Sequence, residues 1–236
     1  MTLINFRVRR ADAVVDHPLA VGRLVIAGWT GRDKAAVEHH IRELEALGVR
    51  PPDSTPVYYP VAAARLSLAN RIEVTAEDSS GEVEFVLIVE GRALYVGVGS
   101  DHTDRQVETY DVTVSKQVCE KPIAPEIWAF EDVRAHWDQL MLRSWIVEGG
   151  RRVLYQEGPV SNMLPPQVLL AGSGLAHDPA PAVLYCGTLP AIGGIRPAQS
   201  FEFELEDPIL GRRITHGYVA SPLRRSFPAA REGAAS

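Results

Sequence analysis

The chain has 236 residues, 46% of them hydrophobic and 23% charged, and its formal net charge is −6. This composition is typical of a globular protein that buries a core without disulfides, and the lack of a basic stripe argues against a nucleic-acid partner. Residues 1–15 hold no apolar run typical of a secretory signal, and no apolar segment approaches the roughly 18 residues of a membrane span. Cys119 and Cys186 cannot build a disulfide framework, so we expect a cytoplasmic protein with reduced cysteines.

A helix is the first well-marked element that the sequence predicts, after a short apolar run at residues 24–27. Asp33 is a suitable N-cap and Gly48 a suitable stop, because a short acceptor side chain and a glycine are typical of these positions. Apolar residues recur between them at helical spacing and are expected to face the core. They are Val37, Ile41 and Leu44.

Prolines mark a change in organisation after this helix. Residues 50–60 hold four of them and must form an extended connection. We therefore predict a small N-terminal portion with a lid-like helix at residues 1–60, followed by a mostly β body at residues 61–223. Residues 224–236, rich in Arg, Ala and Ser, are expected to form a flexible tail.

The pattern of the body is that of strands. A hairpin is predicted over residues 82–98, where two apolar runs flank a short turn. Further strands are expected at residues 71–76, 111–115, 152–155, 182–186, 201–205 and 213–219. A second helix is predicted over residues 130–144, because apolar residues share one helical face and acids stand in the first turn. The result is an α+β fold with more strand than helix.

Two glutamates at the start of the predicted hairpin are the most informative pair. On a strand, Glu82 and Glu84 point to the same face, about 6.8 Å apart along the chain. The run that follows them is typical of a strand buried on both faces, where two carboxylates would repel each other and lose solvation. A divalent cation would resolve both problems, and oxygen ligands suit Mg²⁺ or Mn²⁺. The alternative is an exposed strand end with two solvated acids. Asp101, just past the second strand, could add a third ligand or belong to an ordinary polar turn.

A histidine and a glutamate on the first helix form a second candidate pair. His40 and Glu43 are three residues apart and share a face, and a carboxylate beside a histidine raises its basicity, as a general base requires. The alternative is a surface pair. The loop at Gly187 and Thr188 could hold a substrate carboxylate, and a plain Gly/Pro loop is an equal alternative. Lys116 could clamp a substrate or enolate, although a lone lysine is usually solvated.

These short motifs occur in one order, and in that order the chain resembles the fumarylacetoacetate hydrolase superfamily over roughly residues 23–216. Five segments carry the resemblance: His40-x-x-Glu43, Glu82-x-Glu84 before an apolar strand, Ser100-Asp101-His102-Thr103-Asp104-Arg105, Lys116 followed by Pro122-Ile123-Ala124-Pro125, and Cys186-Gly187-Thr188-Leu189. Each motif is short, and their common order makes the match more specific than any one of them.

The resemblance implies a rolled, mixed β-structure, a β-roll that is usually dimeric and forms the catalytic domain. It also implies a role for each matching residue: Glu82, Glu84 and Asp101 as ligands of Mg²⁺ or Mn²⁺, His40 and Glu43 in proton transfer, Lys116 in contact with substrate or enolate, and Arg105, Gly187 and Thr188 in substrate binding. We expect a homodimer, because the resemblance points to one and because a β-rich body has strands that need covering.

The chain departs from the family pattern at several places. Only 16 residues separate Glu84 from Asp101, where the family usually has a longer and often helical segment. Ser100 stands in place of an asparagine, Ala124 of a glycine and Leu189 of a proline. These departures indicate a divergent branch in which the metal site is kept better than the substrate pocket.

The predicted function is metal-dependent hydrolysis of a carbon–carbon bond next to a carbonyl, in a small 2-oxo acid or acylpyruvate-like substrate. The dication would polarise the carbonyl, and His40 with Glu43 would deprotonate the attacking water. A second interpretation is decarboxylation, dehydration or isomerisation with the same metal and enolate chemistry. A third is a non-catalytic carboxylate-binding protein of the same fold. No nucleic-acid or membrane partner is expected.

Overall fold

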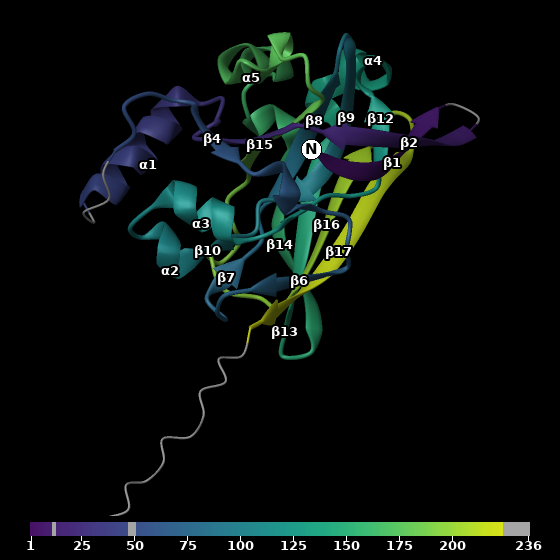
Figure 1. Cartoon of the computed structure of the whole chain (residues 1–236). Coiled ribbons are helices and arrows are strands. Elements are labelled where there is room, and N and C mark those ends of the chain that lie inside the picture. The colour runs from purple at the N-terminus through teal and green to yellow at the C-terminus, as the bar shows by residue number, and fades with distance from the viewer. Residues whose placement is uncertain (11–12, 47–50, 224–236) are drawn as a thin grey trace, which may run out of the picture.

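The computed structural model describes residues 1–10, 13–46 and 51–223, which form two main β-sheets with short helices around them (Figure 1). The strands of the larger sheet are Thr2–Arg10 (β1), Ala13–Val21 (β2), Arg23–Gly28 (β3), Val57–Val61 (β4), Val83–Glu90 (β8), Ala93–Ser100 (β9), Glu126–Ala129 (β12) and Ala182–Thr188 (β15). Within the described residues their order is β2-β1-β12-β9-β8-β15-β3-β4. β1 runs parallel to β12, and β3 to β15, so the sheet is mixed.

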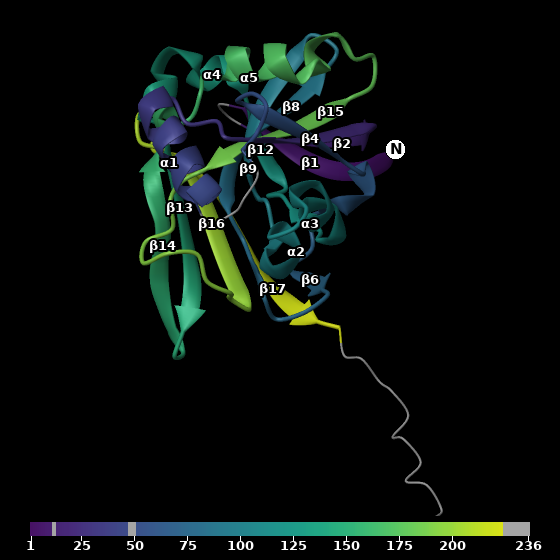
Figure 2. The same cartoon turned by 90° about the vertical axis from the view of Figure 1, so that its left-hand side faces the viewer.

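The smaller sheet consists mainly of long antiparallel strands along one side of the molecule (Figure 2). Its strands are Arg71–Val74 (β6), Met141–Glu148 (β13), Arg151–Pro159 (β14), Ser200–Asp207 (β16) and Arg212–Pro222 (β17), in the order β14-β13-β16-β17-β6. Two short pairs accompany the main sheets: Leu66–Ser67 (β5) with Lys121–Pro122 (β11), and Ser79–Ser80 (β7) with Thr103–Asp104 (β10).

The helices are short and lie around the outside of the sheets (Figures 1 and 2). They are Lys34–Ala46 (α1), Arg105–Glu108 (α2), Val112–Val118 (α3), Phe130–Val133 (α4) and Pro166–Ser173 (α5). Short 3₁₀ segments add Ala63–Arg65, Arg134–Gln139, Val160–Asn162 and Leu175–His177. None of the described helices is long and apolar enough to cross a membrane.

β8 is buried on both faces, as its continuous apolar run predicts. Phe85 and Leu87 belong to the core that the two sheets share, together with Phe203 of β16. Val86 and Ile88 point the other way, into a second core. Burial of each such side chain contributes roughly 1.5–3 kcal/mol. The strand that follows the two glutamates is therefore held from both sides.

The first 60 residues share a sheet with the rest of the chain. β1 to β4 all lie in the larger sheet, and α1 is inserted between β3 and β4. β1 and β2 were not predicted from the sequence, although Ile4, Phe6 and Val8 alternate with less buried polar residues. Pro60 lies in β4, an edge strand, which is where a sheet tolerates proline.

Two predicted elements are wrong. The strand expected at residues 111–115 is instead the start of α3, where the Asp111 carboxylate accepts a 2.9 Å hydrogen bond from Val114 N. The β-branched residues of this segment gave the strand signal, and the cap prevails. The helix expected over residues 130–144 is limited to α4 and a 3₁₀ segment, and β13 begins at Met141. Sheet packing there overrides the helical spacing.

The first helix and the hairpin are confirmed. α1 follows Asp33, whose carboxylate accepts a 2.9 Å hydrogen bond from Ala35 N, as expected of an N-cap. β8 and β9 pair along their whole length without a slip in register. The predicted helix stop at Gly48 and the predicted tail at residues 224–236 lie outside the described residues.

Candidate metal and substrate site

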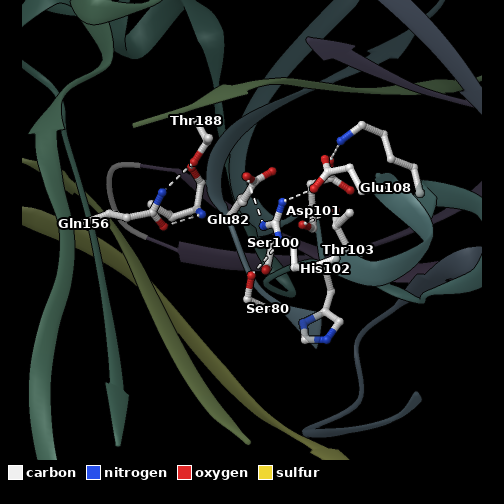
Figure 3. A network of polar contacts seen from close by, with 12 residues as sticks. Ser80, Glu82, Ser100, Asp101, His102, Thr103, Glu108, Gln156 and Thr188 are labelled. Atoms are coloured by element: carbon white, nitrogen blue, oxygen red, sulfur yellow. Dashed lines mark hydrogen bonds and ion pairs between the residues drawn. The ribbon is translucent and has the colours of Figure 1, made fainter. Parts of the chain in front are cut away.

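Three carboxylates meet at the open end of the β8–β9 hairpin, and Figure 3 shows two of them, Glu82 and Asp101. Glu82 directly precedes β8, Glu84 is the second residue of β8, and Asp101 follows β9. A 3.0 Å hydrogen bond from Asp101 N to Glu82 O joins the two strand ends. One oxygen of each carboxylate lies within 4.8 Å of the others, and Glu84 and Asp101 are 2% and 0% exposed. The structure thus brings the three residues predicted as metal ligands together.

An irregularity in β15 supplies a backbone donor to this cluster. The pairing of β15 with β8 shifts register between Tyr185 and Thr188, and Gly187 N donates a 2.7 Å hydrogen bond to Glu84 Oε2. Gly187 has a φ of +91°, and a Cβ there would lie 1.7 Å from Thr30 Oγ1. Only glycine fits this position, and its N–H contacts a carboxylate of the protein.

The environment of Glu84 is suited to a cation. Burial raises the pKa of Glu84 well above its usual value, and the charges of Asp101 and Glu82 raise it further, while Lys116 opposes the rise. A dication among these carboxylates would offset both the desolvation and the repulsion. The three side chains offer oxygen ligands alone, which suits Mg²⁺ or Mn²⁺. The residues therefore fit such an ion.

Two buried lysines contact Asp101. Lys116 Nζ donates a hydrogen bond to Oδ2, and Lys121 Nζ lies 2.9 Å from Oδ1. Burial alone would raise the pKa of Asp101, but the two ammonium groups more than offset it and hold that pKa below its usual range. Oδ1 accepts no well-aligned hydrogen bond from any described residue. Asp101 is therefore an ionised carboxylate with an acceptor oxygen that a cation can use.

The two lysines differ in their surroundings. Burial lowers the pKa of Lys116, but Asp101, Glu82 and Glu108 raise it more, so that its pKa is raised overall. Burial also lowers the pKa of Lys121, and Asp101 only partly opposes this, so that its pKa is lowered overall. Lys116 was predicted as a site residue from the sequence, and Lys121 was not. The only feature of the sequence that could have indicated Lys121 is its position shortly after Lys116.

Arg105 contacts protein groups through all three side-chain nitrogens. Nε donates a 2.7 Å hydrogen bond to Ser80 Oγ, and Nη1 donates a 2.8 Å hydrogen bond to Glu108 Oε2. Nη2 lies 3.0 Å from Glu82 Oε1. Arg105 thus holds a carboxylate of the cluster. The guanidinium has five N–H donors, and these three contacts leave donor capacity on Nη1 and Nη2 for the substrate carboxylate that the resemblance implies.

The hydroxyl of Thr188 is also used inside the protein. It donates a 2.8 Å hydrogen bond to Val83 O and accepts one of 2.8 Å from Gln156 Nε2. Contact with a substrate carboxylate through this hydroxyl would require the bond to Val83 to break. Gln156 was not predicted from the sequence, because it lies outside the five segments that carry the resemblance.

His102, in the segment after β9, is a buried and neutral histidine. Its Nδ1 lies 2.8 Å from Tyr218 Oη, and its Nε2 lies 2.9 Å from Ser79 Oγ. Burial and the charges of Lys121 and Arg105 lower its pKa to about 3. This histidine links β7 to β17 and is a poor proton acceptor.

The predicted proton-transfer pair lies on α1. The backbones of His40 and Glu43 belong to this helix, which lies at the periphery of the molecule (Figure 1). Their side chains are outside the part of the chain that the structure describes. Their role therefore stays a prediction.

Both cysteines are buried and form no disulfide. Burial raises the pKa of Cys119 to about 11, although Lys121 opposes the shift. Burial also raises the pKa of Cys186 well above its usual value. Neither thiol has the lowered pKa of a nucleophilic cysteine.

A family model matches most of this chain. The chain matches the model of the family described as "Protein of unknown function (DUF2848)" over residues 27–218. No curated protein gives a significant match.

Several solved structures have a similar fold. Fumarylpyruvate hydrolase from Pseudomonas aeruginosa, in complex with Mn²⁺ and pyruvate, has a TM-score of 0.62 at 14% identity, over 93% of this chain and 97% of that one. A yeast fumarylacetoacetate hydrolase family protein has a TM-score of 0.59 at 16% identity, over 88% and 97%. An isomerase of 2-hydroxyhepta-2,4-diene-1,7-dioate from Mycobacterium marinum has a TM-score of 0.58 at 16% identity, over 88% and 78%. The chain thus has the fold of the fumarylacetoacetate hydrolase family and belongs to the family of unknown function DUF2848.

Proposed function

We propose that the chain is an enzyme dependent on Mg²⁺ or Mn²⁺ that acts on a small 2-oxo acid or acylpyruvate-like carboxylate. The observation that carries this proposal is the cluster of Glu82, Glu84 and Asp101, whose carboxylate oxygens lie within 4.8 Å of one another. Buried acids with shifted pKa values are concentrated at functional sites. The similar fold of an enzyme solved with Mn²⁺ and pyruvate supports both the ion and the substrate class.

In this proposal Glu82, Glu84 and Asp101 hold the ion. When bound, a dication supplies Lewis-acid polarisation of a substrate carbonyl. Lys116 keeps its charge, because three nearby carboxylates raise its pKa. Its ammonium group would stabilise negative charge that develops on the substrate. Arg105 keeps Glu82 in place through the contact between Nη2 and Oε1.

Proton transfer is assigned to His40 and Glu43 on α1. Hydrolysis needs a base for the attacking water, and a histidine beside a glutamate is a common base. We expect His40→Ala to lower turnover by about 10²–10⁴-fold, the usual contribution of general acid–base catalysis. Mn²⁺ affinity should change little, which calorimetry of the same variant measures. Full activity of His40→Ala would favour a decarboxylation that needs no activated water.

Hydrolysis of a carbon–carbon bond next to a carbonyl is our first candidate for the reaction. Solved structures of similar fold include a hydrolase and an isomerase, so the fold by itself does not select the bond that is broken. Decarboxylation, dehydration and isomerisation use the same chemistry at the carbonyl, and a carboxylate-binding protein would use only the site. A screen of 2-oxo acids and acylpyruvates with added Mg²⁺ or Mn²⁺ separates these alternatives by their products.

Titration of the metal-stripped protein with Mn²⁺ tests the site itself. We expect the native chain to bind the ion, and Glu84→Gln and Asp101→Asn to bind it at least about 10–100-fold more weakly, because ligand loss should exceed the effect of changes outside the ligand shell. Glu77→Gln is the matched control, since Glu77 is an exposed acid that lies outside the cluster. Absence of binding by the native chain, or equal binding by all variants, would remove the proposed function.

A further inference from the structure

Gln156 is a buried side chain that connects the two sheets beside the acid cluster. It belongs to β14 in the smaller sheet and is 1% exposed. Its Oε1 accepts a 3.0 Å hydrogen bond from Val83 N, at the start of β8 in the larger sheet. Figure 3 shows its amide directed towards Thr188 and the segment of Glu82.

The amide of Gln156 makes four hydrogen bonds. Oε1 accepts from Val83 N and, at 2.9 Å, from Ser144 Oγ on β13. Nε2 donates to Thr188 Oγ1 at 2.8 Å and to Leu189 O at 2.6 Å. A side-chain amide has two donor hydrogens and an oxygen with two lone pairs, so its capacity is used completely. The amide thus acts like an added peptide group between the start of β8 and the end of β15.

Both of these segments position acids of the cluster. Val83 stands between Glu82 and Glu84, so a shift of its backbone moves both carboxylates. Thr188 follows Gly187, whose N–H donates to Glu84 Oε2. One amide therefore fixes the glutamate backbone and the backbone donor of Glu84 relative to each other.

We propose that Gln156 is a positioning residue for the metal site, which it acts on through the segments of Glu82, Glu84 and Gly187 without touching the ion. The proposal rests on the proposed function. Groups outside the ligand shell typically change metal affinity by about 10–100-fold when they are lost. Gln156 is placed to have such an effect because it fixes the backbone that carries Glu82 and Glu84 relative to the Gly187 N–H that bonds Glu84.

The test is Mn²⁺ calorimetry of Gln156→Met, a substitution of similar size that removes all four hydrogen bonds. We expect its Mn²⁺ affinity to fall at least about tenfold. Thermal unfolding of the same samples shows how much stability is lost. Gln156→Asn, whose amide stops one methylene short of its partners, should show the same direction of change and decides the matter where Gln156→Met does not fold.

Ser144→Ala is the matched control. It removes one partner of the same buried amide but leaves the contacts to Val83, Thr188 and Leu189 intact. Its Mn²⁺ affinity should stay within about threefold of the native value, well below the tenfold expected for Gln156. Native affinity in the folded Gln156 variants, or an equal loss in Ser144→Ala, would overturn the positioning role while native Mn²⁺ binding persists. Absence of binding by the native chain would instead overturn the proposed function.

Discussion

Asp101 lies between two ammonium groups that act on the cluster unequally. Lys116 contacts Oδ2 and also interacts with Glu82 and Glu84. Lys121 lies beside Oδ1, and Asp101 is the carboxylate that raises the pKa of Lys121. In the metal-free chain, the charge of Lys116 therefore partly compensates the negative charge of the cluster, as a bound cation would.

We expect Lys116→Met to bind Mn²⁺ more tightly than the native chain, by about tenfold or more. Removal of a positive charge from the cluster removes its repulsion of the dication. A loss of about 1.4 kcal/mol of repulsive free energy is enough to raise Mn²⁺ affinity tenfold. Lys121→Met should gain less, because Asp101, and neither glutamate of the cluster, is among the groups that shift the pKa of Lys121. Calorimetric titration of the two variants measures the difference. Weaker binding by Lys116→Met would show that this lysine supports the ion instead.

The raised pKa of Glu84 makes metal affinity depend on pH. Below that pKa the carboxyl is protonated, and a proton competes with the ion, so affinity should rise as pH increases through the pKa. At a pH below that pKa, binding should also release a proton, which calorimetry in buffers of different ionisation enthalpy detects. In Glu84→Gln the pH dependence should flatten. A native affinity that is independent of pH, or that falls as pH rises, would contradict this assignment.

The sequence predicted the acids of the site better than their partners. Spacing on a strand indicated Glu82 and Glu84, because alternation of side chains is a local property. Gln156 and Lys121 reach the site from separate strands, and their contacts depend on how the sheets pack. No local pattern encodes such contacts.

At the scale of elements, the irregular pairing of β15 and β8 determines where a backbone donor meets the cluster. Gly187 combines a φ of +91° with a close approach to Thr30, whereas Gly91 has a φ of +57° and nothing near its missing Cβ. Alanine substitution at Gly91 therefore tests the energetic cost of the backbone conformation alone, and substitution at Gly187 adds the cost of steric overlap with Thr30.

Gly187→Ala should lose clearly more stability than Gly91→Ala. A left-handed conformation costs an alanine roughly 1–2 kcal/mol at either position, and overpacking adds roughly 1–3 kcal/mol at Gly187. Urea unfolding monitored by circular dichroism measures both losses. Gly187→Ala should also weaken Mn²⁺ binding, since its N–H bonds Glu84. Equal losses in the two variants would mean that Thr30 moves aside freely.

Secondary-structure elements were predicted correctly where the local sequence pattern agrees with the tertiary packing. The hairpin of β8 and β9 has continuous apolar runs and a short turn, and it is buried as those runs indicate. At residues 111–115 a capping carboxylate prevails over β-branched composition. At residues 130–144 sheet pairing of β13 prevails over helical spacing. The first error arises where a local capping contact opposes residue composition, and the second where a tertiary contact opposes helical spacing.

At the scale of the whole molecule, strand partners could not be predicted from the sequence. β1 pairs with β12 across more than half of the chain, and β3 pairs with β15. A two-residue period identifies a strand but carries no information about its neighbour. The β-roll was predicted from the resemblance to the fumarylacetoacetate hydrolase superfamily, whereas the order of its strands is known only from the structure.

The homodimer is the remaining prediction at this scale, and β2 is the surface on which we test it. β2 is an edge strand of the larger sheet, and Val14 and Val15 on it are 43% and 50% exposed. An exposed apolar edge tends to pair with another chain, and lysine blocks such pairing. We expect sedimentation of the native chain to give about twice the 25.8 kDa chain mass, and Val15→Lys to shift it towards the monomer. Val147→Lys on β13, where Val147 is 44% exposed, is the control that should stay dimeric. A native chain that sediments as a monomer at micromolar concentration would contradict the dimer, and a dimeric Val15→Lys would move the interface away from β2.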